Sequence, residues 1–234
     1  MCIYGIVWLM AEKAFQDAER KQLSMLARIE KKTLIWLAER LPARVNSDHL
    51  TSLGFVAMFA AGLLYWAASV DSRALLGVVV ALAINWFGDS LDGTLARVRG
   101  RLRPRYGFYV DHITDAVGTF FLMGGMALSS YMNPFIALGL LIVYLLLSIE
   151  VYLTTYTIGS FHLSFWSFGP TELRLLLCIG NIALYVHGPM GKMFGREYRI
   201  FDVGGLIGIM GMSLMLIWSA LRHTRQLYDA ERLS

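Results

Sequence analysis

The sequence predicts an all-α integral membrane protein, with six transmembrane helices and an N-terminal amphipathic helix that lies in the membrane interface. Of its 234 residues, 56% are hydrophobic and 16% are charged, and the mean hydropathy is +0.54. A soluble domain has about a quarter charged residues, so the composition excludes an ordinary soluble enzyme. A membrane-spanning helix needs about 20 apolar residues, and helices close the backbone hydrogen bonds of such runs within lipid. Because six spans use roughly half of the chain, we expect one domain.

Residues 1–46 form the predicted amphipathic and juxtamembrane segment. Between residues 11 and 41, an apolar face recurs at helical spacing and consists of Phe15, Ala18, Met25, Leu26, Ile29, Trp36 and Leu37. This face favours a helix that lies in the interface, and the alternative is a solvated helix that packs on a neighbour. Pro42 should end the helix, and Asn46 or Ser47 can cap the helix that follows.

The six-helix domain is predicted over residues 47–222 and is followed by a tail of residues 223–234. Its apolar stretches, each bounded by charge, proline or glycine, are residues 50–68, 74–95, 107–131, 134–156, 172–187 and 203–221. Lys and Arg accumulate before the first stretch, between the second and third, and in the tail, and such flanks are typically cytoplasmic. Both termini are therefore expected in the cytoplasm, although the last loop carries Lys192, Arg196 and Arg199 on the opposite side.

The net charge of +4 comes from basic residues beside the apolar stretches rather than on a soluble face. This arrangement favours anionic lipid headgroups or phosphorylated substrates as partners, and we expect no nucleic acid.

Four carboxylates lie near the facing ends of the second and third stretches. Asp89 and Asp92 fall in the last turns of the second stretch, and Asp111 and Asp115 fall in the first turns of the third. Spacings of three and four residues put each pair on one face of its helix. The pairs should then face each other just below the cytoplasmic surface. Four ionised carboxylates at this depth repel each other, so a cation is needed between them.

The residues alone leave two explanations for that cation. Arg97 and the arginines of the short loop could form structural ion pairs with the carboxylates. A divalent ion fits oxygen-only ligands better, which indicates Mg²⁺, Mn²⁺ or Ca²⁺ rather than zinc. Metal ions beside arginines suit a diphosphate. Gly93, Gly107 and Gly118 leave room for a ligand or, alternatively, let a neighbouring helix approach closely.

The segment from Asp89 to Asp115 resembles the signature of the CDP-alcohol phosphotransferase family, D-x2-D-G-x2-A-R-x8-G-x3-D-x3-D. All eight fixed residues are present: Asp89, Asp92, Gly93, Ala96, Arg97, Gly107, Asp111 and Asp115. The one departure is a spacer of nine residues, 98–106, where the signature has eight. The resemblance implies the family's six helices and preceding amphipathic helix over nearly the whole chain, and a homodimer through the outer helices.

The resemblance also implies a reaction of phospholipid synthesis. Members transfer a phosphoalcohol from a CDP-linked alcohol to the hydroxyl of a lipid or alcohol acceptor and release CMP. By residue-to-motif matching, the four aspartates would hold one or two Mg²⁺ or Mn²⁺ ions. The motif residues Gly93, Ala96, Arg97 and Gly107 would bind the nucleotide portion. Asp115 would be the base that takes the proton of the acceptor.

His112 is a second candidate for the base, because an imidazole titrates near neutral pH, and its alternative role is structural. An Asp-His pair at this place resembles the choline and ethanolamine phosphotransferases, as do residues 150–159 and 169–172. Those enzymes use a soluble CDP-alcohol and a lipid acceptor such as diacylglycerol. We therefore predict this choice of donor and acceptor first. Glu150, Glu172 and Arg174 are candidates for headgroup recognition, and an intramembrane Glu–Arg pair is the alternative.

Two other functions stay open. CDP-diacylglycerol could be the donor and a soluble alcohol such as glycerol phosphate, inositol phosphate or serine the acceptor, which the arginines between residues 99 and 105 would favour. A cation transporter or channel is the alternative from another class. The lack of internal repeats, and an acidic site at one membrane edge rather than at the midplane, count against it.

Overall fold

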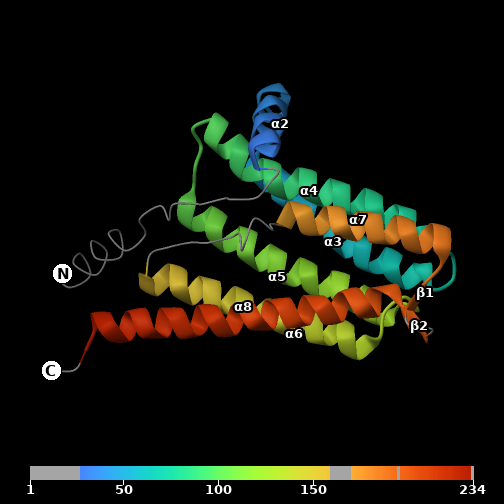
Figure 1. Ribbon diagram of the computed structural model, residues 1–234. Coiled ribbons are helices and arrows are strands. Elements are labelled where there is room, and N and C mark those ends of the chain that lie inside the picture. Colours follow the sequence, from blue (N-terminus) through green and yellow to red (C-terminus); the bar gives the residue numbers. More distant parts are fainter. Residues whose placement is uncertain (1–26, 159–169, 194–195, 233–234) are drawn as a thin grey trace, which may run out of the picture.

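The computed structural model describes residues 27–158, 170–193 and 196–232. Its elements are α2 (Ala27–Arg40), α3 (Ser47–Ala68), α4 (Ala74–Val98), α5 (Pro104–Leu128), α6 (Pro134–Ile158), α7 (Pro170–His187), β1 (Met190–Met193), β2 (Arg196–Arg199) and α8 (Ile200–Ala230). The long helices α3 to α8 run along one another, and α2 lies across them (Figure 1). Strands β1 and β2 form an antiparallel pair between α7 and α8.

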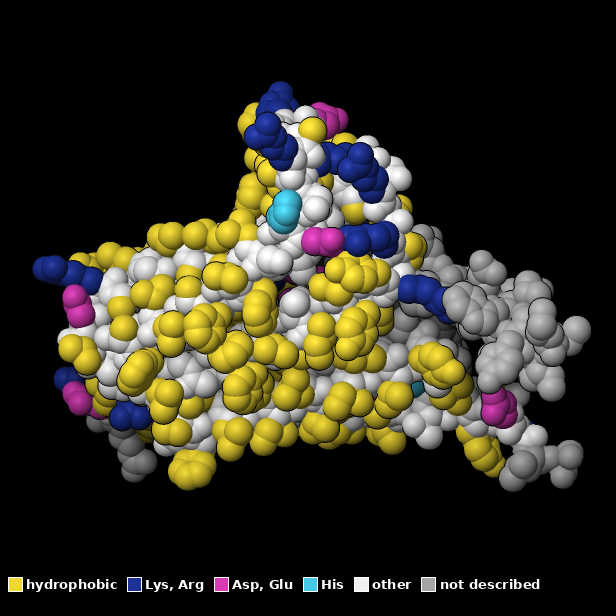
Figure 2. All heavy atoms as spheres, turned by 180° about the vertical axis from the view of Figure 1, so that it is seen from behind, with side chains coloured by type: hydrophobic (Ala, Val, Ile, Leu, Met, Phe, Trp, Pro, Cys, Tyr) yellow, Lys and Arg dark blue, Asp and Glu magenta, His cyan; other side chains and the backbone are white. Residues whose placement is uncertain are grey.

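Within the described part of the chain, four helices are long and apolar enough to cross a membrane: α3, α4, α6 and α8. Hydrophobic side chains cover the length of the bundle in the face seen in Figure 2, as expected of a surface in lipid. The protein is therefore a multi-pass integral membrane protein. The third and fifth predicted spans form α5 and α7, but both fall short because polar residues interrupt their apolar runs, including Asp111 and Asp115 in α5 and Glu172 and Arg174 in α7. Six membrane crossings stay a prediction.

Local sequence signals explain where the helices begin. The side chain of Asn46 accepts a hydrogen bond from the backbone N–H of His49 (2.9 Å), and the His49 imidazole accepts one from the Asn46 N–H (3.3 Å). This reciprocal cap starts α3 and confirms the predicted cap at Asn46. Pro104 occupies the first turn of α5, where its missing N–H costs nothing.

Glycines let α3 touch both of its neighbours. A Cβ added to Gly125 of α5 would lie 2.0 Å from the carbonyl oxygen of Gly62, and one added to Gly88 of α4 would lie 2.5 Å from the carbonyl oxygen of Leu50. No side chain fits at these distances, so the backbones of α3, α4 and α5 pack directly against each other.

Helix α2 packs on α4. Packing on a neighbouring helix was the alternative prediction for the N-terminal segment. Leu34 and Ala38 are buried against Leu91 and Leu95 of α4. Two residues of the predicted apolar face, Ile29 and Trp36, instead remain 67% and 53% exposed. The remaining members of that face before residue 27 lie outside the described residues. The location of α2 in the membrane interface stays a prediction.

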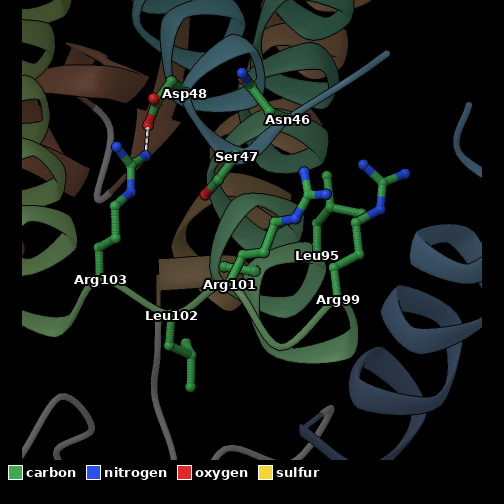
Figure 3. Close-up of a pocket in the computed structure, with 9 residues that line it drawn as sticks. Asn46, Ser47, Asp48, Leu95, Arg99, Arg101, Leu102 and Arg103 are labelled. Carbon is green, nitrogen blue, oxygen red and sulfur yellow. Dashed lines mark hydrogen bonds and ion pairs between the residues drawn. The ribbon is translucent and has the colours of Figure 1, made fainter. Parts of the chain in front are cut away.

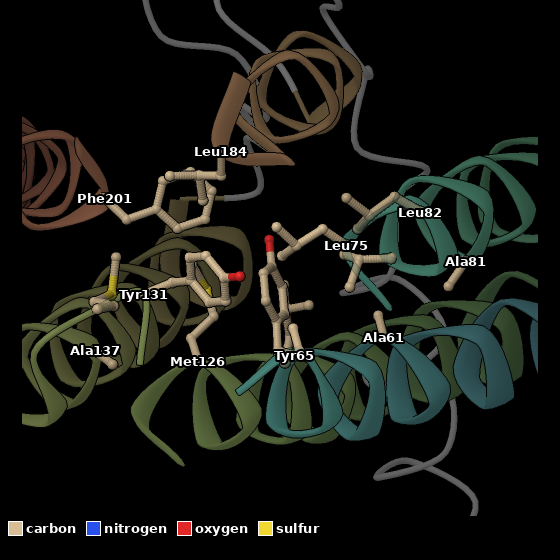
Figure 4. Close-up of a cluster of buried hydrophobic side chains, with 14 residues drawn as sticks. Ala61, Tyr65, Leu75, Ala81, Leu82, Met126, Tyr131, Ala137, Leu184 and Phe201 are labelled. Atoms are coloured by element: carbon tan, nitrogen blue, oxygen red, sulfur yellow. The ribbon is translucent and has the colours of Figure 1, made fainter. Parts of the chain in front are cut away.

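The apolar core fills the half of the bundle where α4 begins and α5 ends. It includes Tyr65, Leu75, Met126, Leu184 and Phe201, which converge from different helices (Figure 4). The hydroxyl oxygen of Tyr65 accepts a hydrogen bond from the Asn181 side chain (2.7 Å). The opposite half, where α4 ends and α5 begins, holds the predicted acidic residues.

Candidate active site

Three of the four predicted aspartates meet between α4 and α5. Asp89, Asp111 and Asp115 each offer one carboxylate oxygen, and these atoms all lie within 4.8 Å of one another. The helices bring them together because α4 ends and α5 begins at the same end of the bundle (Figure 1). The predicted juxtaposition of the second and third stretches is therefore observed for these three residues.

Asp92 points to α3 instead of joining this cluster. It is 9% exposed, and its Oδ2 accepts a hydrogen bond from the Thr51 hydroxyl (2.5 Å), while Oδ1 accepts one from the Gly93 N–H. The Ser47 hydroxyl also donates to the Asp92 carbonyl oxygen (2.9 Å). Residues three apart on a helix diverge by about 60°, which is enough for the neighbouring helix to hold the second carboxylate. Thr51 was not among the predicted site residues.

Among the described residues, Arg174 of α7 is a cation beside the acidic cluster. Its Nη2 lies 2.5 Å from Asp89 Oδ2, and its Nε donates to Asn85 Oδ1 (2.8 Å). Asn85 is itself buried and donates to the carbonyl oxygen of Gly54 in α3 (3.1 Å). Arg174 therefore pairs with Asp89, and not in the intramembrane Glu–Arg pair that was the alternative to headgroup recognition. Asn85 was missed by the sequence analysis, although a lone Asn in an apolar stretch is a usable signal.

A small cavity of about 10 Å³ adjoins the acidic cluster and is lined by Thr51, Gly54, Phe55, Met58, Asn85, Asp89, Thr114 and Asp115. A volume of this size is near the lower limit for one water molecule. The carboxylates thus face a narrow polar space between α3, α4 and α5.

A larger cavity of about 340 Å³ lies between the start of α3 and the loop that joins α4 to α5 (Figure 3). Its lining consists of Asn46, Ser47, Asp48, Leu95, Ala96, Arg99, Arg101, Leu102 and Arg103. Arg103 forms an ion pair with Asp48 on one side of it. The volume is in the range of small-molecule sites, and its wall contains Ala96, one of the predicted nucleotide-binding residues.

One arginine of this loop has a structural role. Arg99 donates hydrogen bonds to the carbonyl oxygens of Leu41 (2.9 Å), Pro42 (3.0 Å) and Val45, and so holds the turn between α2 and α3. These three bonds use only part of the guanidinium, which has five N–H donors. Arg99, Arg101 and Arg103 all line the cavity with positive charge.

The motif glycines differ in what surrounds them. A Cβ added to Gly93 or Gly107 would meet nothing within 4 Å, so close helix packing does not explain either glycine. At Gly118 an added Cβ would lie 3.1 Å from Met58, which fits the packing alternative. Arg97 is exposed at the end of α4.

His112 lies in an aromatic group with Phe108 and Tyr152. The His112 ring stacks on Phe108 at a centroid distance of 4.0 Å and meets the edge of Tyr152 at 4.8 Å. Its Nδ1 lies 2.7 Å from the carbonyl oxygen of Phe108 and 3.5 Å from Asp111 Oδ2. Because a carbonyl oxygen only accepts, Nδ1 carries the proton in that hydrogen bond, and Nε2 holds the lone pair of a neutral ring.

Glu150 lies beside His223 of α8. Its Oε1 lies 2.7 Å from His223 Nδ1 of α8 and accepts a hydrogen bond from the Thr154 hydroxyl (3.0 Å). Arg174, the arginine of the alternative Glu–Arg pair, contacts Asp89 instead. Glu172 lies in the first turn of α7, where a negative charge stabilises the helix.

Carboxylates beside an arginine, together with a basic cavity at the same end of a membrane bundle, are typical of a membrane enzyme that acts on phosphate esters. Residues 46–220 match the model of the CDP-alcohol phosphatidyltransferase family, and the chain belongs to this family. A search of curated proteins gave no match.

The family gives the class of reaction. Its members are transferases of substituted phosphate groups that use CDP-alcohol donors and alcohol or lipid acceptors, and they generally depend on a divalent cation. The donor set of the acidic cluster fits such a cation, because it consists of carboxylate oxygens and contains no sulfur or nitrogen.

Proposed function

We propose that this enzyme transfers phosphocholine or phosphoethanolamine from a soluble CDP-alcohol to the hydroxyl of a diacylglycerol-type lipid, with release of CMP. The observation that carries the proposal is the aromatic group of Phe108, His112 and Tyr152 next to Asp111. An aromatic face attracts an ammonium group within about 6 Å of the ring centre. A carboxylate at the same place adds charge attraction, so this corner of the site suits a cationic alcohol.

In this reaction the acceptor oxygen bonds to the phosphorus that carries the alcohol, and the bond from that phosphorus to the bridging oxygen of the diphosphate breaks. His112 takes the acceptor proton on Nε2, because the hydrogen bond from Nδ1 to Phe108 orients the ring and fixes the tautomer. Asp115 is the alternative base. In that case its carboxylate, beside Asp89 and Asp111, would take the proton instead.

Asp89, Asp111 and Asp115 would hold Mg²⁺ or Mn²⁺, and Asp92 would join them as the fourth ligand after a rotation away from Thr51. Such ions, when bound, neutralise the charge of the diphosphate and stabilise the leaving CMP. Gly93, Ala96, Arg97 and Gly107 would bind the nucleotide, which fits the open space at both glycines and the Ala96 wall of the larger cavity.

The membrane arrangement is part of the proposal. We infer six membrane crossings, with both termini and the active site in the cytoplasm. Lys and Arg concentrate before α3, in the loop between α4 and α5, and at the end of α8, and flanks of this kind are typically cytoplasmic. Helix α2 would lie in the interface, and its exposed Trp36 and Ile29 support this location. The proposed homodimer rests on the family resemblance alone.

A second candidate uses CDP-diacylglycerol as the donor and a phosphorylated soluble alcohol as the acceptor. Arg101 and Arg103 on the wall of the larger cavity favour it, since they supply positive charge for a phosphate besides those of the donor. The partial neutralisation of Arg103 by Asp48 weakens this argument.

The experiment that separates the two candidates is donor binding by purified protein in detergent without added lipid. The proposal expects CDP-choline or CDP-ethanolamine to bind in a Mg²⁺-dependent way and to be displaced by CMP. CMP release from that donor should then require diacylglycerol. Binding of CDP-diacylglycerol alone, with both soluble donors inert at millimolar concentration, would establish the second candidate.

A further inference from the structure

Glu30 is a buried carboxylate on the helix that crosses the bundle. It lies on the face of α2 that packs on α4, and it is only 8% exposed. One of its oxygens, Oε2, is buried and has no hydrogen-bond partner among the described residues. A buried charge that is only half satisfied opposes folding. Stability alone therefore does not account for a glutamate at this position.

The other oxygen joins three helices. Glu30 Oε1 accepts hydrogen bonds from the Trp86 indole N–H of α4 (2.9 Å) and the Thr171 hydroxyl of α7 (2.7 Å), and the Ser90 hydroxyl of α4 lies 3.4 Å away. Hydrogen bonds to a charged acceptor are stronger than those between neutral groups. The carboxylate therefore ties the first turn of α7 to the last turns of α4.

The residues that Glu30 holds are immediate neighbours of the acidic cluster. Ser90 follows Asp89 in α4, and Thr171 lies three residues before Arg174 in α7. Three residues are about one helical turn, so the position of Thr171 fixes where Arg174 meets Asp89. The larger cavity is different, because its lining comes from α3, α4 and the loop after α4 and includes no contact of Glu30.

We propose that Glu30 is a positioning residue for catalysis, which holds α7 against α4 so that Arg174 meets Asp89 in the acidic cluster. The proposal rests on the phosphotransfer activity of the family and on no particular donor. Misplacement of a catalytic group by about 1 Å can cost 10²-fold in rate. Loss of the Glu30 contacts should therefore lower kcat, while the KM of the donor should change little.

The test measures CMP release by the full-length protein in lipid nanodiscs, with whichever CDP-linked donor the wild type uses. A failure of the choline-type assignment would then leave this test intact. Glu30→Ala should lower kcat by about ten-fold or more, and Thr171→Val, which removes only the α7 contact, should give a similar loss. Glu30→Gln should keep most of the activity because it retains an acceptor oxygen. Glu39→Ala, an exposed glutamate on the same helix, is the matched control and should behave as wild type.

Active sites are counted by CMP binding, so that loss of folded protein is separated from loss of rate. Because both changes break one connection, Glu30→Ala with Thr171→Val should be no slower than Glu30→Ala alone. A wild-type kcat in Thr171→Val would overturn the proposal. The proposal would also be overturned if the rate losses of Glu30→Ala and Thr171→Val multiplied in the double variant. An unchanged kcat per CMP-binding site in Glu30→Ala would overturn it as well.

Discussion

At the scale of single residues, two of the four motif aspartates have partners on neighbouring helices. Asp89 is held by Arg174, and Asp92 is held by Thr51 and its own helix. These two carboxylates therefore each have a local partner in the protein. A metal ion that binds Asp89 or Asp92 has to compete with these contacts, which hold the two side chains when no ion is bound.

The first prediction concerns these carboxylates. Asp89→Asn, Asp92→Asn and Asp111→Asn should each reduce CMP release below a few per cent of wild type, because an amide is a poor ligand for a hard divalent ion. The proteins should remain folded in detergent, since the asparagine keeps an acceptor oxygen for the contacts of the aspartate and opens no cavity. Size-exclusion profiles and thermal unfolding measure the second point.

The matched control is Asp229→Asn. Asp229 is an exposed aspartate in the last turn of α8 that pairs with Arg232, and its variant should keep full activity. Excess EDTA should abolish the wild-type activity, and Mg²⁺ or Mn²⁺ should restore it. Full activity in EDTA, or in Asp92→Asn, would contradict the metal assignment.

The second prediction separates the two candidate bases. If His112 takes the acceptor proton, His112→Ala should lower the rate by about 10² or more. Asp115→Asn would then act mainly through metal affinity, so high Mg²⁺ should restore part of its activity. His187→Ala, at the exposed end of α7, is the control for loss of a histidine. An unchanged rate in His112→Ala, together with an Asp115→Asn protein that Mg²⁺ does not rescue, would assign the base to Asp115.

The sequence was sufficient for part of the site. Helical periodicity brings Asp89, Asp111 and Asp115 together, because adjacent helices with a short connection place their facing ends side by side. It could not reveal that Thr51 holds Asp92 or that Arg174 holds Asp89, since these partners lie 41 and 85 residues away along the chain. Such contacts depend on how α3 and α7 pack on α4, which periodicity does not determine.

At the scale of elements, all six predicted apolar stretches form helices, with differences at their ends. The last is extended most, from residues 203–221 to α8 at Ile200–Ala230. Apolar runs mark the part of a helix in lipid, and the polar ends that continue it into water carry no such signal. The hairpin of β1 and β2 was not predicted, since four-residue strands are too short for a clear period.

The third prediction concerns the contact between α3 and α5. Gly125→Ala should destabilise the protein by about 1–3 kcal/mol or more, because the added methyl would lie 2.0 Å from the Gly62 carbonyl oxygen and force the two helices apart. Gly124→Ala is the matched control, since an added Cβ there meets nothing within 4 Å. Thermal unfolding in detergent should show a lower midpoint for Gly125→Ala only. Equal midpoints for the two variants would contradict the observed helix contact.

At the scale of the whole molecule, the bundle divides into an apolar half and a polar half. Tyr65, Leu184 and Phe201 belong to the apolar half, and the acidic cluster belongs to the other. Helices α5 and α7 extend into both halves, and by length and composition they are not among the four clear spans. Whether these two helices cross the membrane decides on which side each loop lies.

The last prediction uses this dependence, with single cysteines in a protein whose Cys2 and Cys178 are replaced by serine. If all of α3 to α8 cross the membrane and the N-terminus is cytoplasmic, Arg44 lies inside and Ser130, in the exposed turn after α5, lies outside. A maleimide that cannot cross membranes should then label Ser130→Cys on intact cells, whereas Arg44→Cys should react only after lysis. With α3 and α4 as the first two spans and α5 not crossing, Ser130 would lie on the same side as Arg44. Equal labelling of both positions would therefore contradict six crossings, and labelling of Arg44→Cys alone would reverse the orientation. Lys192→Cys, beyond α7, should follow Ser130→Cys, because two further crossings return the chain to the outside.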